Sequence, residues 1–145
     1  MKITTKGRYA LRAVLTLAQN SQEKPVSIKQ LAKEEDISPE FLEQIFFRLK
    51  KTGMISSTRG PGGGFRLNRN PSEITLTQIL TGAGEGTGFT PCTREINGKK
   101  PCNRVDFCVA HEIWKEATEH FKKYFDGITL EEVLKRQKAK LAAQK

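Results

Sequence analysis

The sequence predicts a mainly α-helical protein, a winged helix-turn-helix with a small β-hairpin as its wing, followed by a long helix. Three observations carry this prediction. Two short amphipathic segments, 26–36 and 37–53, follow each other across a tight turn. Directly after them, two extended runs flank the Gly/Pro-rich stretch 60–64. Beyond a long polar loop, residues 105–125 keep a helical apolar period.

Residues 8–20 predict a first helix with one buried face. The apolar residues at helical spacing are Leu11, Val14, Leu15 and Ala18. A short second helix is predicted after Ser27, because Ser27 with Gln30 three residues later is a capping-box signature. Its buried residues would be Ile28, Leu31 and Ala32. Asp36 and Ile37 would end this helix.

A third helix is predicted to follow Ser38. Ser38 can cap it, Pro39 can occupy its first turn without losing an amide partner, and Gly53 supplies a stop. Its buried stripe would be Phe41, Leu42, Ile45, Phe46 and Leu49. The residues projecting from its other faces would be Glu40, Glu43, Gln44, Arg48 and Lys51.

The apolar period then changes. Met54–Arg59 and Phe65–Leu67 are extended runs on either side of a turn, which predicts a hairpin. Thr75 and Gln78 form a second capping-box signature and predict a brief helix to about Leu80. Residues 82–103 are rich in Gly, Pro and Thr and have no sustained period, so we expect a long functional or disordered loop.

The C-terminal part predicts two helices. The first would run from Val105 to Phe125, with an apolar stripe. The stripe consists of Ala110, Ile113, Trp114, Ala117, Phe121 and Tyr124. Thr129 with Glu132 is a third capping-box signature that begins the last helix. Residues 135–145 are expected to form a fraying, solvated tail.

The charge distribution favours a polyanionic partner. The formal net charge is +9, and six basic residues but no acidic one occur from Arg48 to Arg69. Lys and Arg gain affinity for nucleic acid by releasing counterions from phosphates, although many basic proteins have other roles. No apolar stretch reaches the roughly 18 residues that span a bilayer, and the N-terminus lacks a signal-peptide pattern. We therefore expect a cytoplasmic protein with no membrane partner.

A winged helix-turn-helix inserts the N-terminal part of its second helix into the major groove, while its wing reaches the backbone or the minor groove. The groove-facing candidates are Ser38, Glu40, Glu43 and Gln44. Gln can read adenine and Glu can accept from the cytosine amine, but exposed Glu and Gln residues are more often simply solvated. Glu43 is expected to reject wrong sites, because a carboxylate repels phosphates and tolerates few bases.

The remaining DNA candidates are basic or lie in the turn. Arg48, Lys50 and Lys51 suit phosphates, and Arg59 suits a narrow minor groove. Gly62, within the turn, is the last candidate. The GPGGG stretch lacks the Lys-Ser/Thr and the helix of a nucleotide-binding loop. Phe47 is expected to pack against the wing; a thymine-methyl contact is the alternative.

All three cysteines, Cys92, Cys102 and Cys108, lie close to His111 in sequence. In a reducing compartment, clustered thiols are more often ligands or redox groups than disulfides, although one disulfide with a spare thiol remains an alternative. A helix that begins near Val105 would place Cys108 and His111 one turn apart on one face, away from the apolar stripe. Three thiolates and an imidazole suit zinc or an iron–sulfur cluster, and the spacing does not choose between them.

Four segments carry a family resemblance. These are ITTKGRYAL near the start, FLEQIFFRLKKTGMISSTRGPGGGFRL, the C-x5-C-x2-H motif, and ITLEEVL near the end. Together they resemble the iron–sulfur-sensing winged-helix regulators typified by IscR, NsrR and CymR, and most closely the IscR-like members. NsrR-type sensors take a carboxylate near the N-terminus as fourth ligand, but position 8 is Arg8, which favours His111 and the IscR-like type.

The resemblance implies a homodimeric bacterial transcription factor, a repressor of iron–sulfur cluster assembly genes that binds a double-stranded DNA operator. Each subunit would hold one [2Fe-2S] cluster through Cys92, Cys102, Cys108 and His111, with assembly proteins as cluster donors. The implied domains are the DNA-binding domain 1–81, the cluster-binding loop 82–104, and the dimerisation and C-terminal helices 105–145. One departure is the gap of nine residues between Cys92 and Cys102, where five are usual; the insertion lies around Asn97 to Lys100.

Two alternatives remain. One is a regulator of the same family that holds zinc or no metal and acts through a protein partner. The other is a small redox enzyme, but the sequence supplies no recognisable catalytic base or substrate pocket, so we predict that the protein is not an enzyme.

Overall fold

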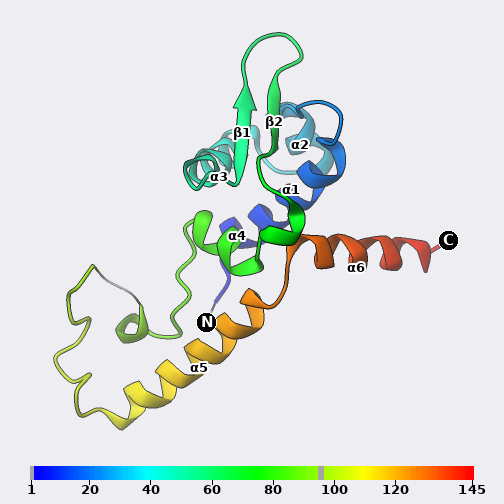
Figure 1. The fold of residues 1–145 in the computed structure, drawn as a ribbon. Coiled ribbons are helices and arrows are strands. Elements are labelled where there is room, and N and C mark those ends of the chain that lie inside the picture. Colours follow the sequence, from blue (N-terminus) through cyan, green and yellow to red (C-terminus); the bar gives the residue numbers. More distant parts are fainter. Residues whose placement is uncertain (1, 95–96) are drawn as a thin grey trace.

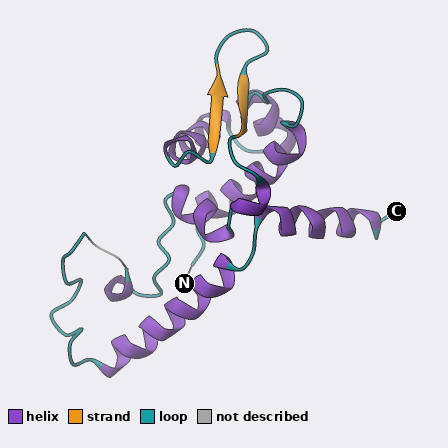
Figure 2. Ribbon diagram, viewed as in Figure 1, coloured by secondary structure: helices purple, strands orange, loops and turns teal. Residues whose placement is uncertain are grey.

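The computed structural model describes residues 2–94 and 97–145 (Figure 1). Along this part of the chain the helices are α1 Thr5–Asn20, α2 Ile28–Glu35, α3 Pro39–Lys51, α4 Leu76–Gly82, α5 Val109–Asp126 and α6 Leu130–Ala142. The strands are β1 Ile55–Thr58 and β2 Gly64–Leu67, and short 3-10 turns occur at η1 Pro71–Glu73 and η2 Pro91–Thr93. The predicted mainly helical fold with a two-stranded hairpin is confirmed (Figure 2).

The core lies between α1, α2, α3, α4 and the base of the hairpin. α1 is central, because it contacts α2, α3, α4, α6 and β2. Its fully buried residues are Ala10, Ala13, Val14 and Leu17. The predicted face was therefore partly wrong, since Leu11 and Leu15 are only half-buried. The small alanines let neighbouring helices approach α1 on several sides, which a search for large apolar residues overlooks.

The helix-turn-helix pair follows the predicted capping. Ser27 Oγ accepts from the Gln30 amide at 3.1 Å, and Ser38 Oγ accepts from the Phe41 amide at 3.1 Å. Only half of the first capping box forms, because the Gln30 side chain donates to Glu34 at 2.9 Å instead. Asp36 ends α2 in the left-handed region, at φ 54°. The tight turn thereby sets the direction in which α3 leaves α2.

The hairpin is anchored to the segment just before α2 and to α3. Ile55 pairs with Leu67 and Thr58 with Gly64. The backbones of Phe65 and Val26 exchange two hydrogen bonds, at 2.7 and 2.8 Å, and a Cβ at Gly64 would collide with the Val26 backbone. The Phe65 ring packs edge-on against Phe46 of α3, with 5.2 Å between ring centroids.

α5 extends away from the helical body, and the long loop after α4 runs out to the end of α5 that is farthest from this body (Figure 1). Helix α5 begins at Val109 rather than at the predicted Val105. Residues 102–107 instead form tight turns, in which Val105 donates to the Cys102 carbonyl and Phe107 to the Arg104 carbonyl. None of the residues of α5 is buried. No helix within the described residues is long and apolar enough to cross a membrane.

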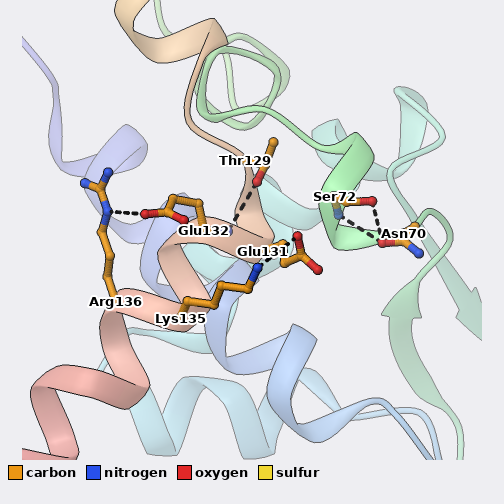
Figure 3. A network of polar contacts seen from close by, with 7 residues as sticks. All are labelled: Asn70, Ser72, Thr129, Glu131, Glu132, Lys135 and Arg136. Carbon is orange, nitrogen blue, oxygen red and sulfur yellow. Dashed lines mark hydrogen bonds and ion pairs between the residues drawn. The ribbon is translucent and has the colours of Figure 1, made fainter.

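α6 is longer than expected, so the predicted fraying tail 135–145 was wrong for most of its length. Thr129 caps the helix through the Glu132 amide at 3.2 Å (Figure 3). Two pairs one turn apart support it, Glu131 with Lys135 at 3.5 Å and Glu132 with Arg136 at 3.0 Å. The hydrogen bond that Arg136 donates to the Glu132 carboxylate raises the pKa of Arg136. Ala, Leu, Lys, Gln and Arg are good helix formers, which explains how an exposed segment stays helical.

Candidate functional site

The predicted DNA-contacting residues lie on the exposed side of α3 and on the hairpin tip. All of them are exposed: Ser38, Glu40, Glu43, Gln44, Arg48, Lys51, Arg59 and Gly62. The Ser38 hydroxyl oxygen is already used to cap α3. Lys50 turns toward the hairpin and donates to Ser57 Oγ at 2.6 Å. The exposed surface of α3 therefore presents acidic, amide and basic groups to a partner.

Two grooves flank the exposed ridge of α3. The groove on the hairpin side measures about 560 Å³, and its lining includes Glu40 and Glu43. The groove on the α4 side measures about 640 Å³, and its lining includes Arg48 and Lys51. Gln44 and Phe47 line both grooves. The carboxylates of α3 therefore lie toward the hairpin, where Lys50 accompanies them, and Arg48 and Lys51 lie toward α4.

Phe47 does not pack against the wing, which corrects our prediction. Its side chain is 61% exposed, and Lys51 Nζ lies 4.4 Å from the ring centroid. Phe46 already occupies the position against the hairpin ring Phe65. Successive residues of a helix point about 100° apart, so Phe47 is directed outward.

The wing, residues 59–64, is a tight turn that projects beyond the helices (Figure 1). Gly60 and Gly62 have φ values of 94° and 74°, a region that favours glycine. The Gly63 amide donates to the Gly60 carbonyl at 2.9 Å, which closes the turn. These glycines therefore shape the tip that carries Arg59.

The predicted metal ligands lie between η2 and the start of α5. Cys92 Sγ lies 3.0 Å from Thr90 Oγ1, and Cys102 Sγ accepts from the Arg104 amide at 3.4 Å. Cys108 is the N-cap residue of α5 and so lies outside the helix, contrary to prediction, whereas His111 lies within its first turn. All three cysteines are half-buried free thiols, so the disulfide alternative is not realised in this structure.

Cys92 and His111 line one pocket of about 290 Å³. Arg94, Lys99 and Lys115 also line it and make it basic. His111 Nδ1 is buried and has no hydrogen-bond partner among residues 2–94 and 97–145. A buried polar atom without a partner costs on the order of 1 to 3 kcal/mol, so this nitrogen suits a ligand bound in the pocket.

The structure does not bring all four predicted ligands together. Cys102 and Cys108 are not among the residues that line the pocket of Cys92 and His111. Within residues 2–94 and 97–145, no group of three or more His, Cys, Asp or Glu side chains is arranged to hold one metal ion. The four-ligand set therefore remains a prediction, with two of its members at one pocket.

Comparison with known proteins identifies the family. The model of the Rrf2 family, described as "Iron-dependent Transcriptional regulator", matches residues 3–136. The chain belongs to the Rrf2 family. The resemblance noted in the sequence is thereby confirmed, and the protein is a DNA-binding transcriptional regulator rather than an enzyme.

Individual Rrf2 relatives agree with this placement. The chain is 39% identical over 137 residues to the HTH-type transcriptional regulator IscR of Xenorhabdus nematophila, covering 94% of this chain and 81% of the relative. It is 37% identical over 145 residues to that of Serratia proteamaculans, covering 100% and 86%.

Solved structures show the same fold. IscR of T. potens has a TM-score of 0.74 at 31% identity, covering 94% of this chain and 88% of that one. CymR, the global cysteine regulator of B. subtilis, has a TM-score of 0.73 at 29% identity, covering 94% and 98%.

One residue of this Rrf2 chain that we did not predict connects the loop after α4 to the start of α1. Glu85, just after α4, is buried, and its Oε1 accepts from the amides of Thr4 at 3.1 Å and Gly7 at 2.9 Å, and from the Thr4 hydroxyl. A Cβ at Gly84 would lie 2.6 Å from Arg48 Nη1. The first residues of the loop therefore contact both the start of α1 and the basic edge of α3.

A sequence signal for this contact existed. α1 has no acidic residue in its first turn, and the Thr4 side chain does not cap it. A helix start without a local cap needs acceptors from elsewhere in the chain. Glu85 supplies them, and its negative charge suits the positive end of the helix dipole.

The apolar stripe of α5 is largely uncovered in the single Rrf2 chain. Ile113 is 54% exposed and Tyr124 is 60% exposed. The loop covers only part of it, where the Phe89 ring lies 5.0 Å from the Phe121 ring and the Phe89 amide donates to Thr118 Oγ1 at 3.1 Å. The loop is held on α5 next to η2, which carries Cys92.

Proposed function

We propose that this protein is a cytoplasmic iron–sulfur-responsive regulator that represses iron–sulfur cluster assembly genes. Each subunit of a homodimer would hold one [2Fe-2S] cluster through Cys92, Cys102, Cys108 and His111. The observation that carries the proposal is the buried His111 Nδ1, which has no partner within the described part of the chain and lies in the same basic pocket as Cys92. IscR-named regulators that match nearly the whole chain support it.

The donor set fits a cluster. Thiolates ligate iron–sulfur clusters, and an imidazole can replace a thiolate on one iron. Arg94, Lys99 and Lys115 line the pocket, so their positive charges offset the negative charge of a thiolate-ligated group. When bound, the cluster would act as a regulatory ligand, because its presence depends on the cellular supply of iron and sulfur.

The remaining ligands would be brought in by the loop. Cys102 lies among tight turns, and Cys108 directly precedes α5. Loop lengthening costs only about 0.6 kcal/mol per doubling, so the longer gap after Cys92 does not prevent closure onto one centre. Iron–sulfur assembly proteins would donate the cluster to this site.

The route from the loop to the DNA-reading surface passes through Gly84 and Glu85. Glu85 holds the start of α1, and Gly84 lies beside Arg48 of α3. A cluster that favours one arrangement of the loop would favour one arrangement of these contacts and so change the spacing of two α3 helices across a dimer. A coupling free energy of about 1 to 3 kcal/mol is typical of such switches.

The proposed homodimer would bury the apolar stripe of α5. Ile113, Trp114, Phe121 and Tyr124 are all large and exposed along this helix. Contiguous apolar surface of this kind marks an interaction site. A second copy would bring a second α3 and wing to an operator of double-stranded DNA.

The test is anaerobic purification followed by iron, sulfide and zinc analysis and a visible spectrum. We expect two irons and two sulfides per subunit, as the formula of the cluster requires, with visible absorption that bleaches on reduction. A colourless protein with stoichiometric zinc would replace this proposal with the zinc-bound alternative, because three thiolates and one imidazole also suit zinc. A protein that contains neither iron nor zinc would favour the alternative in which the regulator acts through a protein partner.

A further inference from the structure

We propose that Phe47 contacts the 5-methyl group of a thymine in the major groove and so determines one position of the operator sequence. The proposal rests on the placement of α3 as the recognition helix in the proposed function. Phe47 is apolar and was not among the polar and charged residues of α3 that we predicted to contact DNA.

The position of Phe47 on α3 is the first argument. Phe47 and Gln44 line both of the grooves that flank the helix. Glu43 lies on one side of them, and Arg48 lies on the other. Cations flank the ridge formed by Gln44 and Phe47, with Lys50 in the hairpin-side groove and Arg48 and Lys51 in the other. If these cations contact the phosphates on either side, the ridge between them faces the base edges.

The packing of Phe47 is the second argument. The other two phenylalanines of α3 have protein partners, because Phe41 packs edge-on against Tyr9 at 5.9 Å and Phe46 against Phe65 at 5.2 Å. Phe47 has Lys51 Nζ at 4.4 Å from its ring centroid and remains 61% exposed. A single exposed apolar residue is common, so its exposure has meaning here only together with its place on the ridge.

The chemistry of the groove selects the ligand. Thymine is the base that presents a methyl group in the major groove, and phenylalanine contacts that group favourably. Beside the same ring, the amine of cytosine or adenine would lose water without gaining a hydrogen bond. Phe47 is therefore expected to favour thymine at one position of each half-site.

The expected size of the effect follows from the methyl group alone. Burying one such group contributes about 0.8 kcal/mol, which corresponds to roughly a fourfold change in affinity. A larger loss would need a polar contact in addition.

The experiment uses the full-length protein and the DNA duplex that it selects from a random pool. Each thymine is replaced in turn by deoxyuridine, which removes only the methyl group, and binding is measured by fluorescence anisotropy. We expect one thymine per half-site at which deoxyuridine weakens wild-type binding about fourfold. In Phe47→Ser that position should bind thymine and deoxyuridine equally, whereas Phe47→Leu should keep part of the difference.

Equal sensitivity to deoxyuridine in the wild type and Phe47→Ser would overturn the proposal, as would a wild-type protein insensitive at every thymine. A change of oligomeric state in Phe47→Ser would also overturn it, since the ring would then contact protein. Matching melting temperatures would establish that Phe47→Ser is folded. If the wild type selects no DNA, the assignment of α3 fails as well, so the two failures are distinguishable.

Discussion

The side chain of Glu85 accepts a hydrogen bond from the backbone amide of Gly7 at 2.9 Å, although 78 positions separate the two residues. The contact is close, because a Cβ at Gly7 would lie 2.7 Å from Glu85 Cγ. It joins the start of α1 to the beginning of the long loop after α4. The helical body and the proposed cluster loop are therefore connected by a buried carboxylate as well as by the chain.

Replacing Glu85 by Ala should lower the free energy of unfolding by on the order of 2 to 3 kcal/mol, because the amides of Thr4 and Gly7 lose a charged acceptor. Chemical denaturation measures the change. Gly7→Ala alone should also destabilise, by about 1 to 3 kcal/mol, through overpacking against Glu85. The double variant should be more stable than the sum of the two losses implies, and strict additivity would contradict the contact.

Replacing His111 by Ala should remove the bound iron and sulfide, whereas His120→Ala should keep both. The two histidines lie on the same helix, but His120 is exposed, and only His111 lines the pocket of Cys92. Iron and sulfide analysis of anaerobic preparations gives the comparison. Retention of a full complement by His111→Ala would remove this residue from the ligand set.

Replacing Ile113 by Glu should dissociate the homodimer, because it places a charge in the exposed apolar stripe of α5. Lys122→Glu is the control, since Lys122 is exposed and lies roughly 180° around the helix from Ile113. Sedimentation velocity at several concentrations reports the mass of each variant. A wild type that is monomeric at all concentrations, or a dimeric Ile113→Glu variant, would place the interface elsewhere.

Replacing Arg59 by Ala should weaken operator binding by about 1 to 3 kcal/mol if the wing enters the minor groove. Arg69→Ala removes the same charge but should change binding little, because Arg69 donates to the Glu73 carbonyl at 2.7 Å away from the wing tip. Gel-shift titrations at one salt concentration compare the two. Equal losses would assign the effect of Arg59 to net charge alone.

Replacing Glu43 by Ala should broaden the range of bound sequences, because a carboxylate beside base edges rejects most of them. Selection from a random DNA pool gives a sequence preference for each protein. Indistinguishable preferences for the wild type and the variant would show that Glu43 is merely solvated.

Local signals in the sequence predicted the DNA-binding half well. The caps at Ser27, Ser38 and Thr75 were confirmed, as was the hairpin around the glycine turn. Each depends on residues within a few positions of one another, so a single stretch of sequence contains the whole cause. The buried face of α3 was also confirmed, except that Phe41 is only partly buried.

The features that the sequence did not reveal depend on distant contacts. The outward direction of Phe47 follows from the packing of Phe46 against Phe65, and the role of Glu85 follows from the position of α1. The start of α5 was misplaced because residues 102–107 prefer tight turns although their apolar spacing continues the helical period. A spacing pattern cannot reveal which of two local conformations the neighbouring loop stabilises.

The lack of buried residues along α5 has a consequence for protein abundance. Most of the stability of a helix in a protein comes from packing of its apolar face, so α5 depends for its persistence on whatever covers its stripe. If that cover is a second copy, the fraction of chains with a formed pocket rises with the number of copies in the cell.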